Sequence, residues 1–260
     1  MNMSRSIQLR GRVVAGGAEP LVCAPLVARD LDSLRAEAAT VVAKQPDLLE
    51  WRVDFFEALG DVDRIAGAAR ELRRIARDIP IIYTRRSIRE GGQPITASED
   101  TVSRGIETVC ADGSVDFVDC ELGSAPEHFQ RALRAAKASG ALLIGSFHDF
   151  QRTPSLSDLA EKFATAERLG ADVAKVAVMP GDVGDVLALL QATLDASRRH
   201  AMPLITMSMG PYGALTRLFG WMFGSTVSFA VGSRASAPGQ VPIDDVRSVL
   251  EVLRRSLSAR

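Results

Sequence analysis

The chain has 260 residues, of which 47% are apolar and 24% charged, values typical of a globular protein and not of a disordered one. Its 31 basic and 32 acidic side chains give a net charge of -1, which indicates no nucleic-acid or membrane surface but leaves room for a small anionic ligand. There is no apolar run of signal-peptide length near the N-terminus and none of about 18 residues for a membrane span, so we expect a cytoplasmic protein.

The predicted elements begin with an alternation of polar and apolar side chains at residues 6–14, which reaches Gly16 and Gly17. It predicts a β-hairpin, within residues 1–17, that closes the lower end of the fold. After residue 20, short β-branched runs alternate with longer amphipathic runs. The strand runs are residues 21–26, 48–53, 79–84, 115–120, 141–146, 173–178, 204–207 and 226–231. The helical runs are residues 32–43, 62–77, 99–110, 126–139, 156–169, 183–199, 213–219 and 243–257.

Eight strand–helix pairs without a linker-like stretch predict one domain over residues 1–260, an α/β protein folded as a (β/α)8 TIM barrel. The alternative is an open doubly wound parallel sheet. That fold commonly has a glycine-rich turn after its first strand, whereas residues 27–30 read Val-Ala-Arg-Asp. The barrel is therefore favoured.

Charged side chains interrupt several of the predicted strands. In a parallel sheet covered by helices the outward side is apolar, and side chains alternate along each strand. Leu49, Trp51 and Val53 form that outward side in the second strand. The same alternation predicts that a set of polar side chains points into the barrel: Glu50, Arg52, Asp54, Thr84, Arg86, Asp119 and Glu121. Glu90 follows in the loop after Arg86. They lie at the strand ends where barrel active sites form; the alternative is an antiparallel strand with a solvated face.

Two further residues stand out chemically. Lys175 lies inside an otherwise apolar strand run, and burial of an ammonium favours the neutral amine, the nucleophile that converts a ketone to an imine. The alternative is a lysine that extends along the barrel rim to solvent. His148 ends the fifth strand run, where general bases are found, although a structural histidine at a strand end fits that position too. His128 and His200 are predicted to lie at the surface.

Several blocks resemble one family, the type I 3-dehydroquinate dehydratases. The blocks occur in order between about residue 20 and residue 250: Glu50-Trp51-Arg52-Val53-Asp54, Ser146-Phe147-His148-Asp149-Phe150, Ala174-Lys175-Val176-Ala177-Val178-Met179-Pro180, Ile205-Thr206-Met207-Ser208-Met209-Gly210, Phe223-Gly224-Ser225 and Ser236-Ala237-Pro238-Gly239-Gln240. Each block alone is a weak signal, but together they are specific.

The resemblance implies a barrel enzyme, usually a homodimer, that converts 3-dehydroquinate to 3-dehydroshikimate in the shikimate pathway. It places the Schiff-base lysine at Lys175, the general acid–base histidine at His148, and the carboxylate that orients this histidine at Glu90. The implied substrate contacts are Glu50, Arg52 and Arg86 to hydroxyls, a carboxylate clamp of Arg217, Ser236 and Gln240 with Ala237 beside it, and an apolar wall of Met207, Met209 and Phe229. Asp54, Asp119 and Glu121 are expected to support them.

We expect no metal or organic cofactor, because the imine itself accepts electrons and no His, Cys and carboxylate set has metal-ligand spacing. Residues 232–242 are expected to form a lid that orders on the substrate.

The rival functions are a Schiff-base aldolase on the same fold, which commonly has a glycine-rich phosphate site, and a catalytically inactive barrel that only binds a ligand or partner.

Overall fold

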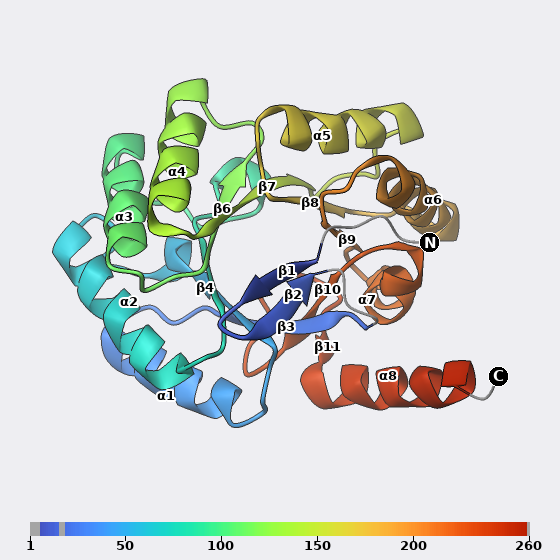
Figure 1. Ribbon diagram of the computed structural model, residues 1–260, viewed down its shortest axis with the longest axis horizontal. Coiled ribbons are helices and arrows are strands. Elements are labelled where there is room, and N and C mark those ends of the chain that lie inside the picture. The colour runs from blue at the N-terminus through green and yellow to red at the C-terminus, as the bar shows by residue number, and fades with distance from the viewer. Residues whose placement is uncertain (1–5, 16–18, 259–260) are drawn as a thin grey trace.

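Helices surround a parallel sheet in the computed structural model, which describes residues 6–15 and 19–258 (Figure 1). The strands are β1 Ile7–Leu9, β2 Arg12–Ala15, β3 Leu21–Leu26, β4 Leu48–Arg52, β5 Ile81–Thr84, β6 Phe117–Glu121, β7 Leu142–Asp149, β8 Val173–Val178, β9 Leu204–Ser208, β10 Val227–Val231 and β11 Val241–Pro242. The helices are α1 Leu31–Val42, α2 Val62–Ala76, α3 Glu99–Ala111, α4 Pro126–Ser139, α5 Leu156–Arg168, α6 Val183–Arg199, α7 Gly213–Phe219 and α8 Ile243–Ser258. Short 3-10 helices span Val53–Phe55, Ile88–Glu90 and Gly220–Phe223.

The sheet follows the order β11-β10-β3-β4-β5-β6-β7-β8-β9, and all its pairings are parallel. Its two sides meet where Leu204 at the start of β9 bridges to Ser225, just before β10. The Thr226 amide donates to the Leu204 carbonyl across this junction at 2.7 Å. The predicted barrel is confirmed, and the doubly wound alternative is wrong.

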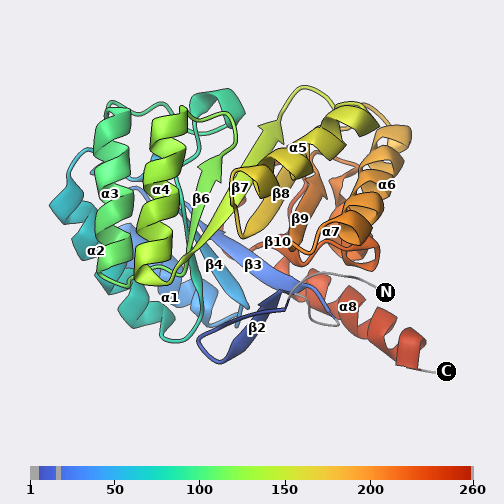
Figure 2. The same ribbon diagram turned by 45° about the horizontal axis from the view of Figure 1, so that its top comes forward.

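The hairpin of β1 and β2 lies across one end of the barrel (Figure 1). In Figure 2 the arrows of β6 and β7 point away from it, so it covers the end where the barrel strands begin. Ile7 packs into the apolar interior with Cys23 and Phe117, and Arg10 Nε binds Asp116 Oδ1 at 2.6 Å. The predicted hairpin is therefore confirmed for residues 7–15. Residues 1–5 and 16–17 of the predicted segment lie outside the described residues.

Apolar side chains on the outer side of the strands pack against the helices. Leu49, Trp51, Val53 and Val118 belong to this outer core, as the alternation predicts. The side chains between them therefore point to the barrel axis, with their charged ends near the carboxyl ends of the strands. No helix among the described residues is long and apolar enough to cross a membrane.

Several strand boundaries differ from the prediction. β4 ends at Arg52, because the Asp54 carboxylate accepts two hydrogen bonds of 2.8 Å from the Arg52 guanidinium and the chain turns into a 3-10 helix. β5 starts two residues late, after Pro80, which has no amide hydrogen for the ladder. β7 continues to Asp149, paired with Val178, so His148 lies within the strand.

Candidate active site

A cavity opens at the carboxyl ends of the barrel strands. Most of the residues expected at the substrate line it. The lining residues are Glu50, Arg52, Arg86, Glu90, Gly91, His148, Phe150, Lys175, Ala177, Met207, Met209, Phe229, Ser236, Ala237 and Gln240. This end of a barrel is where the catalytic groups of such folds gather, because the side chains of different strands meet there.

Lys175 on β8 is buried and reaches two carboxylates. Its Nζ lies 3.0 Å from Glu50 Oε1 and 3.1 Å from Asp119 Oδ2, and it sits 4.5 Å from the ring centroid of Phe229. Thr84 Oγ1 donates to the same oxygen of Glu50 at 3.0 Å. The amine is thus held at the cavity by partners from three other strands, in the fixed position that nucleophilic attack on a bound carbonyl requires.

Arg86 joins a buried group of carboxylates beside this lysine. Its guanidinium lies 2.6 Å from Asp119 and 3.2 Å from Glu121, and it donates to Ser146 Oγ at 2.9 Å. Burial acts to lower the pKa of Arg86, but Asp119, Glu121 and Glu90 outweigh it, so the pKa is raised. Burial likewise acts to raise the pKa of Asp119, but Arg86 and Lys175 outweigh it and the pKa is lowered. Both groups therefore stay charged.

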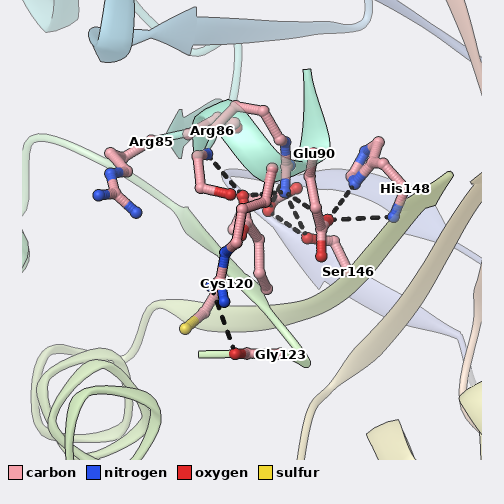
Figure 3. Close-up of polar contacts among 12 residues, drawn as sticks. Arg85, Arg86, Glu90, Cys120, Gly123, Ser146 and His148 are labelled. Atoms are coloured by element: carbon pink, nitrogen blue, oxygen red, sulfur yellow. Dashed lines mark hydrogen bonds and ion pairs between the residues drawn. The ribbon is translucent and has the colours of Figure 1, made fainter. Parts of the chain in front are cut away.

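His148 and Glu90 form a hydrogen-bonded pair at the edge of this group (Figure 3). Glu90 Oε2 lies 2.9 Å from His148 Nδ1 and accepts the backbone N–H of His148 at 3.0 Å. Burial, Arg86 and Lys175 lower the pKa of His148 well below its usual value, so the ring is neutral. With Nδ1–H donating to Glu90, Nε2 is left with a free lone pair. Such a nitrogen can accept a proton in the cavity.

Glu90 itself is a poorly stabilised carboxylate. Burial, followed by the charge of Glu121, raises its pKa to about 8, although Arg86 3.5 Å away opposes the shift. Figure 3 shows Glu90 lying between Arg86 and His148. The protonation of Glu90 therefore changes in the pH range where enzymes work.

The predicted lid, residues 232–242, contributes Ser236, Ala237 and Gln240 to the cavity lining. Its Ser236 amide donates to Gln240 Oε1 at 2.9 Å, and Gln240 Nε2 donates to Ser236 Oγ at 3.2 Å. Gly239 has φ +77°, and a side chain there would collide with the carbonyl oxygen of Gly210. Only glycine fits that contact, which holds the lid against the loop after β9.

Arg217 on α7 lies behind the cavity wall and is not one of the residues that line it. Its guanidinium donates to the carbonyl oxygens of Phe229 and Pro238, each at 3.2 Å, and its Nε has no partner among the described residues. Burial lowers the pKa of Arg217 to about 10. Among the described residues, the hydrogen-bond partners of this cation are all uncharged: two carbonyl oxygens and the Met207 sulfur.

Three lining residues were not predicted as site residues: Gly91, Phe150 and Ala177. Phe150 and Ala177 belong to the motif blocks, and the Phe150 ring occupies the space that a side chain at Gly91 would need. Ser146 was also missed, although it shares the inward side of β7 with His148 and donates to Asp119 at 2.6 Å. Strand alternation could have identified it. Asp54, Asp119 and Glu121, predicted to support the site, lie behind the lining side chains.

Comparison with known proteins agrees with this geometry. The type I 3-dehydroquinase family profile matches residues 22–256. The chain belongs to the type I 3-dehydroquinase family. It is 56% identical to the 3-dehydroquinate dehydratase of Aromatoleum aromaticum over 257 residues, covering 99% of each chain.

Solved structures of family members have the same fold. The crystal structure of 3-dehydroquinate dehydratase from Geobacillus kaustophilus is 51% identical with a TM-score of 0.95, over 98% of this chain and 99% of that one. The type I enzyme from Clostridium difficile, solved with covalently modified comenic acid, is 34% identical with a TM-score of 0.92, over 97% and 99% of the two chains. The resemblance of the motif blocks to this family is confirmed over nearly the whole sequence.

Proposed function

We propose that this protein dehydrates 3-dehydroquinate to 3-dehydroshikimate through an imine on Lys175, with His148 as the general acid and base. The observation that carries the proposal is the meeting of a buried lysine and a neutral histidine at one cavity, in a chain of this family. The alternative functions, an aldolase or an inactive barrel, do not require a histidine whose Nε2 can accept a proton.

The reaction begins when Glu50, 3.0 Å from Nζ, takes one proton from the ion-paired Lys175, and the free amine attacks the ketone carbon. The proton then returns to the hydroxyl of the carbinolamine. Loss of water then leaves an iminium that links the ring to Nζ. Glu50 and Asp119, which hold Nζ at 3.0 and 3.1 Å, fix the direction of attack and lie near enough to stabilise the iminium charge. Glu50 and Asp119 therefore contact Nζ both in the resting lysine and in the iminium.

His148 performs the proton transfers that follow. Its Nε2 removes a proton from the carbon next to the iminium carbon, and the electron pair moves into the iminium to give an enamine. The protonated ring then gives this proton to the hydroxyl one carbon further, whose C–O bond breaks to release water. The enamine electrons form the new C=C bond and restore the iminium, and a second water hydrolyses it to product and free Lys175.

The remaining residues bind and orient the ring. Glu50, Arg52 and Arg86 would hold its hydroxyls, and Met207, Met209 and Phe229 would form the apolar wall. Arg217, with Ser236, Ala237 and Gln240 of the lid, would close on the carboxylate. Asp54, Asp119 and Glu121 support this set, because each accepts a hydrogen bond from Arg52 or Arg86. We expect the enzyme to serve the shikimate pathway in the cytoplasm as a homodimer.

An absorbance assay tests the proposal. Purified protein mixed with 3-dehydroquinate should produce the conjugated enone of 3-dehydroshikimate, and the Lys175→Ala variant should lose this turnover by several orders of magnitude. An aldolase would cleave a carbon–carbon bond instead, and an inactive barrel would leave the spectrum unchanged. Either result would refute the dehydratase assignment.

A further inference from the structure

The first residues of the lid, Gly232 and Ser233, which we call the root of the lid, pack against α1 on the outside of the barrel. Gly232, the first residue after β10, packs so closely on α1 that an added side chain would lie 2.7 Å from a methyl group of Val41. Lys44, just beyond the end of α1, donates from Nζ to the Gly232 carbonyl at 2.6 Å. The lid therefore leaves the barrel along α1 before it crosses the cavity.

Glu37 on α1 is a buried carboxylate that the reaction does not use. Its Oε1 accepts the hydroxyl of Ser233 at 2.9 Å, and its Oε2 accepts the backbone N–H of Val27 at 2.9 Å. Among the residues that the structure describes, the partners of this carboxylate are the Ser233 hydroxyl and the Val27 amide, neither of which is charged. The other buried residues of α1 are apolar: Leu34, Ala38 and Val41.

A carboxylate buried without a counter-ion is costly, and an apolar residue at this position of α1 would pack at lower cost. Its two acceptor oxygens tie together segments that are distant in sequence, the loop after β3 and the root of the lid. Three residues beyond Ser233, the lid reaches Ser236, whose carbonyl faces Arg52 at 3.5 Å. Ser233 therefore lies three residues before the first residue of this segment that lines the cavity, Ser236.

We propose that Glu37 is a positioning residue that holds the lid over the cavity through its hydrogen bond with Ser233. This inference rests on the proposed function, since it assigns Glu37 to the lid that would close on the substrate. Glu37 does not line the cavity and acts through Ser233. Loss of the contact lowers the population of lids in the binding arrangement, and the apparent affinity falls by the same fraction. Lys175 and His148 remain untouched, so KM rises while kcat is preserved.

The test combines kinetics of Ser233→Ala, Glu37→Ala and the double variant. The loss of one partly exposed side-chain hydrogen bond predicts a rise in KM of about two- to tenfold in each single variant, with kcat within about twofold of the wild type. Both changes remove the Glu37–Ser233 contact, and Glu37→Ala also removes the hydrogen bond from Val27. The KM of the double variant should therefore match that of Glu37→Ala instead of multiplying the two effects. Glu37→Gln should restore KM, since its carbonyl can accept from Val27 and its amide can donate to Ser233. Thr40→Ala, on the exposed side of the same helix, is the matched control and should behave as the wild type.

Hydrogen exchange of the lid amides gives a readout that is independent of turnover. Exchange of residues 232–240 should be faster in Ser233→Ala and Glu37→Ala than in the wild type and in Thr40→Ala. Ser233 is exposed, so its variant tests the contact even if Glu37→Ala does not fold. Lower thermal stability with unchanged KM and unchanged lid exchange would overturn the inference and leave Glu37 a purely structural residue. If the wild type failed to dehydrate 3-dehydroquinate, the proposed function would fail, while the exchange rates would still decide whether Glu37 holds the lid.

Discussion

Two buried arginines on opposite sides of the barrel mouth differ in what surrounds their charge. Arg86, after β5, lies among the carboxylates of Asp119, Glu121 and Glu90, which keep its pKa above the usual value against the effect of burial. Arg217, on α7 after β9, has only uncharged partners among the described residues, two carbonyl oxygens and the Met207 sulfur, and burial lowers its pKa to about 10. One charge is compensated inside the protein and the other is not.

The difference divides the site into two halves. The half that holds Arg86 is a closed network of side-chain ion pairs, and it fixes Lys175 and His148 for chemistry. The half that holds Arg217 consists of backbone carbonyls, apolar side chains and the segment 232–242, and we propose that its cation pairs with the carboxylate of the substrate. A buried arginine near a cavity can thus pair with a ligand anion only when no carboxylate of the protein already compensates its charge.

The largest effect on the chemical half is expected at His148. His148→Ala should lower kcat by about 10²–10⁴, the usual contribution of general acid–base catalysis, with little change in KM. His200→Ala serves as the control, because His200 pairs with Glu167 away from the cavity. Steady-state kinetics separates the two constants. A His148 variant that changes KM alone would place His148 in the binding half.

The two arginines should differ in what their removal does to stability. Arg86→Met leaves buried carboxylates unpaired and should lower the free energy of unfolding by about 3–5 kcal/mol. Arg217→Met removes an uncompensated charge and loses hydrogen bonds to two carbonyls, so it should be destabilising by about 1–2 kcal/mol at most. Urea denaturation of both variants measures this. Equal losses would show that the charge of Arg217 is compensated after all.

Substitutions in the binding half, the side of the site that holds Arg217 and the lid, should mainly raise KM. Gln240→Ala removes one lid contact and should raise KM by about two- to tenfold with kcat preserved. Arg217→Ala should raise KM by about 10–150-fold, the range for a charge-assisted contact, and should also lower kcat because a misplaced ring misaligns the proton to be removed. Initial rates at varied substrate concentration decide this. Wild-type constants in Gln240→Ala would refute the clamp and lid roles.

A smaller effect is expected when Glu90 is replaced, and it concerns how the stability of the protein depends on pH. Its folded pKa of about 8 lies above the ordinary value of 4.5, so its contribution to stability is complete below 4.5 and is lost as the pH rises through about 8. Glu90→Gln does not titrate and can still accept from His148 with its carbonyl oxygen. The variant should therefore become progressively more stable than the wild type from about pH 4.5, and the gap should level off above about pH 8. Thermal unfolding across this range checks the trend; a gap independent of pH would contradict it.

Strand alternation alone predicted which charged residues enter the barrel, because a helix-covered sheet leaves no other place for Glu50, Asp119 or Glu121. It could not predict their partners. Lys175 meets Glu50 only because the barrel brings β4 and β8 to one cavity, 125 residues apart in sequence. The end of β4 was missed because a side-chain pair, Arg52 with Asp54, ends the strand, and no backbone pattern records that.

The lid side was less predictable for the same reason. Glu37 in a helical run reads as a surface residue, and only its contact with Ser233 shows that it faces inward. Arg217 was expected at the ligand by resemblance, yet its side chain points to the carbonyls behind the wall. The local sequence pattern predicts whether a segment is a helix or a strand and which of its sides faces inward. It does not predict contacts between loops, because these form only when the barrel closes.

The most direct test of this account is reductive trapping on Lys175. The chain has four lysines, and among them Lys44, Lys137 and Lys162 lie away from the cavity. Borohydride added with 3-dehydroquinate should inactivate the enzyme irreversibly, add the mass of one ligand to the intact protein, and place that mass on Lys175 after proteolysis. Lys175→Arg should gain no mass. A label on another lysine, or full activity and an unchanged mass after reduction, would contradict the Schiff-base mechanism.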